Sequence, residues 1–230
     1  MLKIVSGCVF YFLTFALIGC NSSEKSSSEQ TSVDTTAINL PRKKVKNILI
    51  FGNSLTAGYG LEPAEAYPSL LQNRLDSLQL PYKIINAGLS GETTSGGNSR
   101  LDWVLKNTVD IFILELGGND GLRGIPATET RKNLQAMIDK VKAKYPEAKI
   151  ILAGMQVPPS MGKKYAEEIR IIYPELAKKN NVGLIPFLLE NVGGELKLNQ
   201  KDGIHPNAEG AKIVAENVWS KLEGYLQKSV

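Results

Sequence analysis

Three residues of this 230-residue chain have the types and the order needed for nucleophilic attack on a carbonyl group. Ser54 lies in the stretch ILIFGNSLTAGYG, residues 48–60, directly after an apolar run where a strand would end and a helix begin. His205 is the only histidine, so it is the only imidazole available as a general base. Asp202 precedes it by three residues across Gly203, close enough to bond one ring nitrogen and fix the tautomer. This set predicts acyl transfer by a serine nucleophile.

Acyl transfer also needs hydrogen-bond donors for the oxyanion that develops on the carbonyl. Gly91 can bring its backbone N–H close to a substrate because it has no side chain, and Asn119 can offer an amide N–H. The backbone N–H of Ser54 is a third candidate. Each residue also has a structural interpretation, because serine and histidine cap helices while glycine and asparagine form turns. Only convergence of these segments in space separates the two interpretations.

Five short apolar runs, often β-branched, are typical of parallel strands that are covered on both faces. Helical patterns lie between most of them. The repeated alternation of strand and helix predicts a single α/β domain built on a parallel sheet. The predicted strands are residues 45–52, 82–88, 109–117, 148–155 and 182–187.

Four helices are predicted from apolar stripes, at residues 63–80, 127–145, 161–180 and 206–227. The stripe of the first helix is expected to include Leu78. Pro174 should kink or break the third helix, because proline has no N–H to bond the preceding turn. Pro206 should occupy the first turn of the last helix, where that N–H is not needed.

Small and polar residues concentrate where the predicted strands end. In open parallel sheets, ligands bind outside the carboxyl ends of the strands. The candidate nucleophile, base and oxyanion donors are therefore expected at one edge of the sheet. The segments concerned are residues 52–55, 88–93, 117–121 and 155–159, together with 202–206 before the last helix.

The composition excludes several other kinds of site. The net charge is +4, and the longest run of basic residues, 42–44, lies in a predicted linker, so nucleic acid is not an expected partner. No cysteine follows Cys20, which excludes a disulfide or a thiolate metal site in the domain. A single histidine excludes zinc sites that need two. The sequence does not determine the oligomeric state, and a monomer is expected.

Four segments resemble, in order, the consensus blocks of the GDSL or SGNH hydrolases: GNSLTAGYG, NAGLSGETTSGG, LELGGNDGLRG and DGIHPNAEG. Residues 154–190 are similar to the branch of that family that contains arylesterases and thioesterase I/lysophospholipase L1. The resemblance covers about residues 45–226. It implies a three-layer α/β/α sandwich, flavodoxin-like, with a five-stranded parallel sheet, and no cofactor or metal.

The resemblance also implies a role for each residue already singled out. The implied roles are nucleophile for Ser54, base for His205, partner of the base for Asp202, and oxyanion donors for Gly91, Asn119 and the Ser54 N–H. Asn53 departs from the pattern, because the family usually has aspartate before the serine. The triad carboxylate is that of Asp202, so Asn53 is expected to tune activity rather than to abolish it.

An acyl pocket is expected from apolar residues after the third and fourth strands, which alternatively serve only to cover the core. An uncharged wall of this kind favours neutral or fatty acyl groups. The expected function is a serine esterase, a carboxylic ester hydrolase acting on aryl esters, lysophospholipids or acyl thioesters. The alternatives are an esterase for carbohydrate or cell-wall acetyl groups, which an extended polar groove would favour, and a binding lipoprotein without catalysis. The candidate wall residues are Leu122, Ile125, Met155, Val157 and Met161.

Residues 1–19 have the pattern of a secretory signal, with Lys3 ahead of an apolar run that is short for a membrane span. The run ends in LIGC, which resembles a bacterial lipobox and implies that Cys20 is acylated. The following residues, to 44, are rich in serine and threonine and predict a flexible linker. The expected protein is thus a lipoprotein of the bacterial cell envelope, on the periplasmic or extracellular face. Its hydrolase domain spans 45–230.

Overall fold

The computed structural model describes residues 44–227. The predicted signal peptide, the lipidated Cys20 and all of the linker except its last residue lie outside the described residues, so those expectations remain predictions. Between residues 44 and 227, none of the helices is both long enough and apolar enough to cross a bilayer.

Within the described residues, five strands form one parallel sheet in the order β2-β1-β3-β4-β5. The prediction of a five-stranded parallel sheet is therefore confirmed. The strands are β1 (Lys46–Gly52), β2 (Tyr82–Gly88), β3 (Ile111–Glu115), β4 (Lys149–Ala153) and β5 (Gly183–Ile185).

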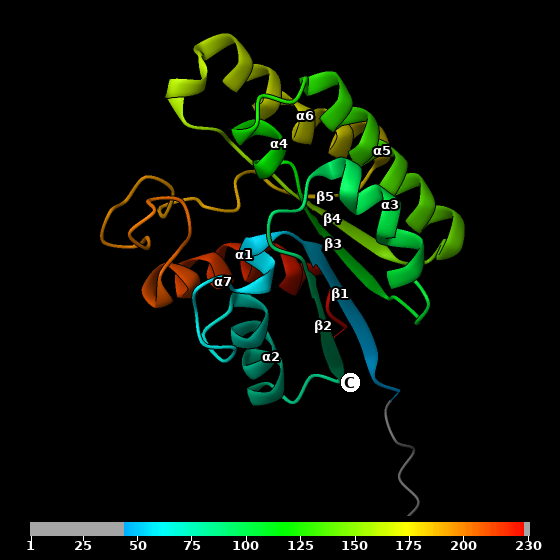
Figure 1. The fold of residues 1–230 in the computed structure, drawn as a ribbon. Helices are drawn as coiled ribbons and strands as arrows, with labels where there is room; N and C mark the ends of the chain where they lie inside the picture. Colours follow the sequence, from blue (N-terminus) through cyan, green and yellow to red (C-terminus); the bar gives the residue numbers. More distant parts are fainter. Residues whose placement is uncertain (1–43, 228–230) are drawn as a thin grey trace, which may run out of the picture. The chain divides into compact units, whose positions relative to one another are not determined.

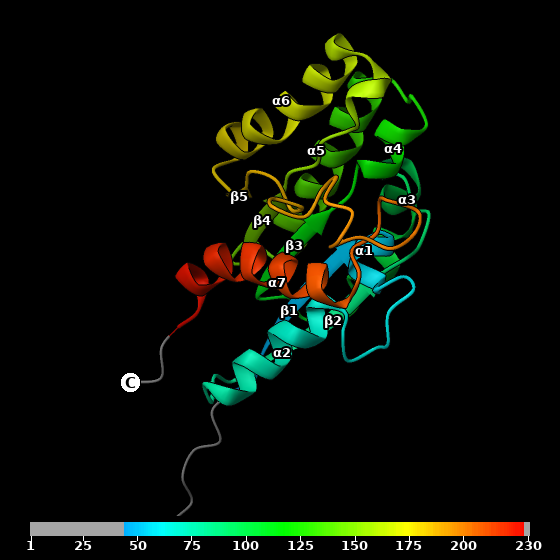
Figure 2. The ribbon, with the colours of Figure 1, turned by 90° about the vertical axis from the view of Figure 1, so that its left-hand side faces the viewer.

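Helices cover both faces of the sheet, as its apolar strands require. In Figures 1 and 2, one group of helices lies on one face of the sheet and a second group on the other, which gives the predicted three-layer sandwich. The first layer consists of α3 (Thr94–Val104), α5 (Ala127–Lys144) and α6 (Lys163–Asn180), and the second of α2 (Tyr67–Ser77) and α7 (Ala208–Leu222). Short segments complete the chain: α1 (Ser54–Ala57), α4 (Gly118–Leu122), η1 (Pro159–Met161) and η2 (Glu223–Tyr225).

Two prolines differ from what the sequence predicted. The helix α6 continues through Pro174, so the predicted alternative of a break at this residue is wrong. One missing hydrogen bond is tolerated there because the neighbouring Tyr173 is fully buried and holds the helix against the sheet. Pro206 lies before α7, not in its first turn. The cap is Asn207, whose side-chain oxygen accepts hydrogen bonds from the N–H groups of Glu209 and Gly210.

The helix α3 was not predicted, and Leu78 was wrongly predicted to be buried. Two glycines, Gly96 and Gly97, weaken the helical signal of α3. Gly97 is needed because a Cβ there would lie 2.4 Å from Leu116 Cδ1, so the helix packs directly on the sheet. Leu78 is 54 % exposed because α2 has already ended at Ser77.

The strand order places the ends of three strands side by side. β1 pairs with β2 on one side and with β3 on the other, so Gly52 is in register with both Gly88 and Glu115. The chain reverses its direction across the sheet at this point, and such a switch point leaves a crevice outside the carboxyl ends. The segments after these three strands therefore meet at one edge.

Candidate active site

Ser54 is placed by the sharp turn between β1 and α1. Asn53 caps the helix, with its side-chain oxygen accepting a hydrogen bond from the N–H of Leu55 at 2.9 Å. Ser54 is the first helical residue and is 8 % exposed. Gly52 must be glycine, because a Cβ there would lie 2.2 Å from Thr56 Oγ1 and 2.3 Å from Glu115 Oε2. The serine thus combines the two roles considered from sequence: it opens a helix and its hydroxyl faces a cavity.

The structure brings Ser54, His205 and Asp202 together. Ser54 Oγ lies 2.8 Å from His205 Nε2, and His205 Nδ1 lies 2.7 Å from Asp202 Oδ2. With the Nδ1–H donating to the carboxylate, Nε2 carries the free lone pair that faces the serine hydroxyl. This is the geometry in which an imidazole can take a proton from a serine.

The Asp202 carboxylate is built into a tight turn. Its Oδ1 accepts hydrogen bonds from the backbone N–H groups of Ile204 and His205, both at 3.0 Å. Gly203 has a φ of +75°, which glycine adopts without strain. Partial burial acts to raise the pKa of Asp202, but the hydrogen bonds from His205 and Ile204 outweigh it and lower the pKa to about 2. The carboxylate is therefore ionised throughout the neutral range.

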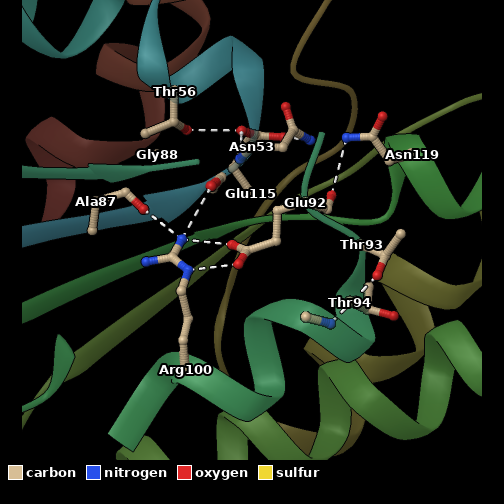
Figure 3. Close-up of polar contacts among 12 residues, drawn as sticks. Asn53, Thr56, Ala87, Gly88, Glu92, Thr93, Thr94, Arg100, Glu115 and Asn119 are labelled. Carbon is tan, nitrogen blue, oxygen red and sulfur yellow. Dashed lines mark hydrogen bonds and ion pairs between the residues drawn. The ribbon is translucent and has the colours of Figure 1, made fainter. Parts of the chain in front are cut away.

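Asn119 lies on α4, directly after β3, and faces the same cavity as Ser54. Its side-chain Nδ2 donates a hydrogen bond to the backbone carbonyl of Glu92 at 3.0 Å, as Figure 3 shows. This bond uses one of the two amide protons and leaves the other for a ligand. The bond also fixes which end of the amide carries the nitrogen.

Gly91 precedes Glu92 and has a φ of +80°. Unlike Asn119, Gly91 is not among the residues that line the cavity beside Ser54. Its carbonyl accepts a hydrogen bond from Arg123 at 2.9 Å. Within residues 44–227, no intramolecular acceptor takes the N–H of Gly91, which leaves this group available.

A buried ion pair holds the loop that carries Gly91. Arg100 of α3 donates from Nε and Nη2 to the two carboxylate oxygens of Glu92, each at 2.5 Å, and Glu92 has a side-chain exposure of 3 %. The same guanidinium donates to the carbonyl of Ala87 at 2.8 Å (Figure 3). It also stacks over the ring of Phe51. Bidentate pairs of this kind fix orientation as well as position.

A cavity of about 420 Å³ opens beside Ser54 and His205. Of the five residues predicted to form an acyl pocket, Leu122, Met155 and Val157 line it. Ile125 and Met161 do not: the Ile125 carbonyl accepts a hydrogen bond from Tyr165, and Met161 packs against the core. The cavity has the size of sites that bind small organic ligands.

Several residues of the site were missed from sequence. The segment after β5 contributes Phe187, Leu189, Gly193 and Gly194 to the cavity. The rule that ligands bind beyond the carboxyl ends of strands applies to β5 as well, so this signal was available. The ring of Tyr59 lies 4.7 Å from that of His205, centroid to centroid, and nothing in the sequence pointed to this contact.

Glu115 is a fully buried carboxyl group behind the nucleophile, and sequence reasoning missed it too. Its Oε2 accepts hydrogen bonds from the N–H of Asn53 at 3.0 Å and from Thr56 Oγ1 at 2.7 Å. Its Oε1 accepts one from Asn53 Nδ2 at 2.7 Å. Burial raises the pKa of Glu115 to about 7, although the hydrogen bonds from Thr56 and Asn53 act in the opposite direction.

This raised pKa predicts a specific pH dependence of stability. The unfolded chain loses the Glu115 proton near pH 4.5, whereas the folded protein keeps it until about pH 7. Between these values the folded state binds more protons, so raising the pH favours unfolding. The contribution of Glu115 is fully present below pH 4.5 and lost above pH 7, and it amounts to roughly 3 kcal/mol.

The measurement is urea unfolding at a series of pH values for the parent protein and for Glu115→Gln. The parent should lose stability relative to the variant as the pH rises through this window. Parallel pH dependences of the two free energies of unfolding would show that Glu115 does not titrate there.

The fold and the site define a class of protein. It is an α/β protein in which hydrogen bonds link a serine to a histidine and the histidine to an aspartate, beyond the carboxyl ends of the strands of a parallel sheet. Residues 50–213 match the model of the GDSL-like Lipase/Acylhydrolase family. The chain belongs to this family.

Similar proteins agree with this assignment. Esterase TesA of Pseudomonas aeruginosa is 38 % identical over 79 % of this chain and 90 % of its own length. Thioesterase 1/protease 1/lysophospholipase L1 of Escherichia coli (strain K12) is 38 % identical over 76 % of this chain and 83 % of its own. A crystal structure of TesA matches with a TM-score of 0.76 and 38 % identity, over 79 % of this chain and all of the solved one.

Proposed function

We propose that this protein is a serine esterase that hydrolyses carboxylic esters through an acyl-enzyme, with Ser54 as the nucleophile. The observation that carries this proposal is the continuous pair of short contacts from Ser54 Oγ to His205 Nε2 and from His205 Nδ1 to Asp202 Oδ2. Membership of the lipase/acylhydrolase family supports the same chemistry.

The geometry supports a reaction in two steps, acylation of Ser54 and hydrolysis of the acyl-enzyme. His205 Nε2 takes the proton of Ser54 as Oγ bonds to the ester carbonyl, and the imidazolium then gives that proton to the leaving alcohol. In the second half, His205 takes a proton from water as the water oxygen attacks the acyl-enzyme, and returns it to Ser54 Oγ. Asp202 stays ionised throughout and stabilises the imidazolium in both halves.

The oxyanion is stabilised by donors from the turns that follow β1, β2 and β3. These are the backbone N–H groups of Ser54 and Gly91 and the free amide proton of Asn119. The Glu92 carbonyl holds the Asn119 amide in the donating orientation before substrate arrives. A preorganised donor of this kind is worth about 10²–10³ in rate.

The cavity indicates the class of acyl group. Its lining consists mostly of apolar side chains and glycines, with the polar side chains of Asn53, Ser54, Asn119 and Gln156 among them. Among the described residues that line it, only His205 can carry a charge. A neutral acyl chain fits such a wall, whereas an extended polar groove suited to a sugar polymer does not match it. Aryl esters, lysophospholipids and acyl thioesters are the proposed substrates. The name thioesterase 1/protease 1/lysophospholipase L1 of a similar protein supports the last two.

The direct test is labelling with a fluorophosphonate probe, which reacts with activated serines. The folded parent protein should be labelled in a single position, and the modified peptide should contain Ser54. A folded sample that is not labelled and that cleaves no p-nitrophenyl ester would rule out the esterase. Preferential turnover of acetylated sugars over the p-nitrophenyl esters would favour the carbohydrate esterase instead.

Leu122 and Ile125 provide a matched test of the acyl pocket, because they are aliphatic neighbours in sequence and only Leu122 lines the cavity. Leu122→Ala should lower kcat/KM for p-nitrophenyl octanoate by about 3–10-fold through loss of apolar contact, and leave p-nitrophenyl acetate nearly unchanged. Ile125→Ala should not change the ratio between the two esters. An equal shift of this ratio in both variants would place the acyl chain elsewhere.

We also propose that Cys20 carries a lipid that anchors the protein to a membrane of the cell envelope, on the strength of the sequence LIGC after an apolar run. Metabolic labelling with a palmitate analogue should mark the parent but not Cys20→Ser. Equal labelling of both would refute acylation at this residue.

A further inference from the structure

The residues on both sides of Ser54 are held by the carboxyl group of Glu115. Glu115 ends β3, in register with Gly52 at the end of β1, and it does not line the cavity. Its hydrogen bonds reach Asn53, the residue before the nucleophile, and Thr56, two residues after it. The carboxyl therefore contacts the turn that carries Ser54 without being able to touch a substrate.

The orientation of the Asn53 side chain is set from two directions. Its Oδ1 accepts a hydrogen bond from the N–H of Leu55 and lies 3.4 Å from Ser54 Oγ, while its Nδ2 donates to Glu115. A flipped amide would place donor against donor at Leu55 and acceptor against acceptor at Glu115. Glu115 thus determines which atom of Asn53 lies beside the serine hydroxyl.

The cluster has no spare room, and it is tied to a second helix. A Cβ on Gly52 would overlap both Glu115 and Thr56, so β1 packs directly on the carboxyl group. Thr56 Oγ1 is also 2.7 Å from the hydroxyl of Tyr67 on α2. The charge of Glu115 acts on two other titratable side chains, the buried phenols of Tyr67 and Tyr173. Burial, with this charge as a lesser cause, raises the pKa values of both phenols well above 10.0, so both stay neutral.

We propose that Glu115 is a positioning residue for the Ser54 nucleophile, and that Asn53 and Glu115 form a complementary pair that fixes the β1–α1 turn in its reactive conformation. This inference rests on the proposed esterase function. It also gives a reason for asparagine at position 53. The Asn53 amide donates to the Glu115 carboxylate, with Nδ2 at 2.7 Å from Oε1. An aspartate would place a carboxylate oxygen where Nδ2 now lies, so two carboxyl groups would face each other at this distance. Such carboxyls must share a proton or separate.

A double-mutant cycle tests the pair. In Glu115→Gln, the Gln oxygen must accept the hydrogen bonds from the N–H of Asn53 and from Thr56. The NH₂ group of the Gln then faces the NH₂ group of Asn53, and two donors cannot bond each other. Glu115→Gln should lower kcat by about 10–100-fold, with little change in KM. The double variant Asn53→Asp/Glu115→Gln reverses the bond, since the Gln amide now donates to the Asp carboxylate. It should recover kcat to within about threefold of the parent.

Asn53→Asp alone gives an independent readout that does not depend on the folding of Glu115→Gln. Its activity should decrease at alkaline pH, where the shared proton is lost and the two carboxylates repel, and the parent should lack this decrease. Val141→Ala, a core change on α5 remote from the site, is the control: it should lower the free energy of unfolding and leave kcat unchanged.

The inference is overturned if Glu115→Gln keeps kcat within about twofold of the parent, or if the double variant is no better than Glu115→Gln. A parent-like pH profile for Asn53→Asp would also overturn it. Failure of the esterase function itself is recognised separately, because the parent protein would then show no hydrolysis that depends on Ser54.

Discussion

Ser54→Ala should reduce kcat/KM for p-nitrophenyl esters by at least about 10⁴-fold while the protein remains folded. The expected loss is this large because the variant lacks the atom that bonds to the acyl carbon, and no other group occupies its place beside His205 Nε2. The fold should tolerate the change. Alanine is compatible with the first turn of α1, and the cap that begins this helix is made by Asn53.

Steady-state kinetics with an active-site titration provides the measurement, and circular dichroism verifies the fold. Ser90→Ala is the matched control, because Ser90 is an exposed serine in the loop after β2. It should keep the parental rate. Residual activity of Ser54→Ala within about tenfold of the parent would remove Ser54 from the role of nucleophile.

Asp202→Asn should lower kcat by about 10⁴-fold with a nearly unchanged structure. Oδ1 of this side chain accepts hydrogen bonds from two backbone N–H groups, so an asparagine must keep its oxygen at that position. Its NH₂ group then faces His205 Nδ1 as a donor. The imidazole is forced into the tautomer that carries its proton on Nε2, where it can no longer accept the proton of Ser54.

The control for this variant is Asp110→Asn. Asp110 accepts a hydrogen bond from the N–H of Asn47 at 2.8 Å, beside the amino end of β1 and far along the strands from the catalytic edge. It should leave kcat unchanged, whereas Asp202→Asn should also weaken fluorophosphonate labelling at neutral pH. Similar rates for the two variants would mean that Asp202 does not set the tautomer of His205.

The ionisation of Asp202 is not expected to limit activity on the acid side. Asp202 is ionised down to a pKa of about 2, so it cannot cause a decrease in kcat/KM between pH 4 and 8. His205 accepts the proton of Ser54 through the lone pair on Nε2, so the base must be a neutral imidazole. Glu115 titrates near pH 7 and changes stability in the opposite direction, since its contribution is lost as the pH rises.

Local sequence patterns were enough to predict the layers of the fold and most of the catalytic candidates. Strand 82–88 and the buried stripe of α5 are local patterns, set by which residues avoid water along a few turns or pleats, and the structure reproduces them. The pairing of Asp202 with His205 is equally local, because a three-residue turn determines it. A single histidine left no second candidate for the base.

Which residues lie opposite these candidates could not be predicted, because it depends on how the whole domain packs. Glu115 is 62 positions from Asn53, and their contact depends on the register between β1 and β3, which no local pattern encodes. The same holds for the segment after β5 that completes the cavity, and for the separation of Leu122 from Ile125, which follow one another closely but point to different surroundings. Side-chain partners across a sheet are selected by packing of the whole domain, and so Asn53 could be understood only when its partner, Glu115, was seen.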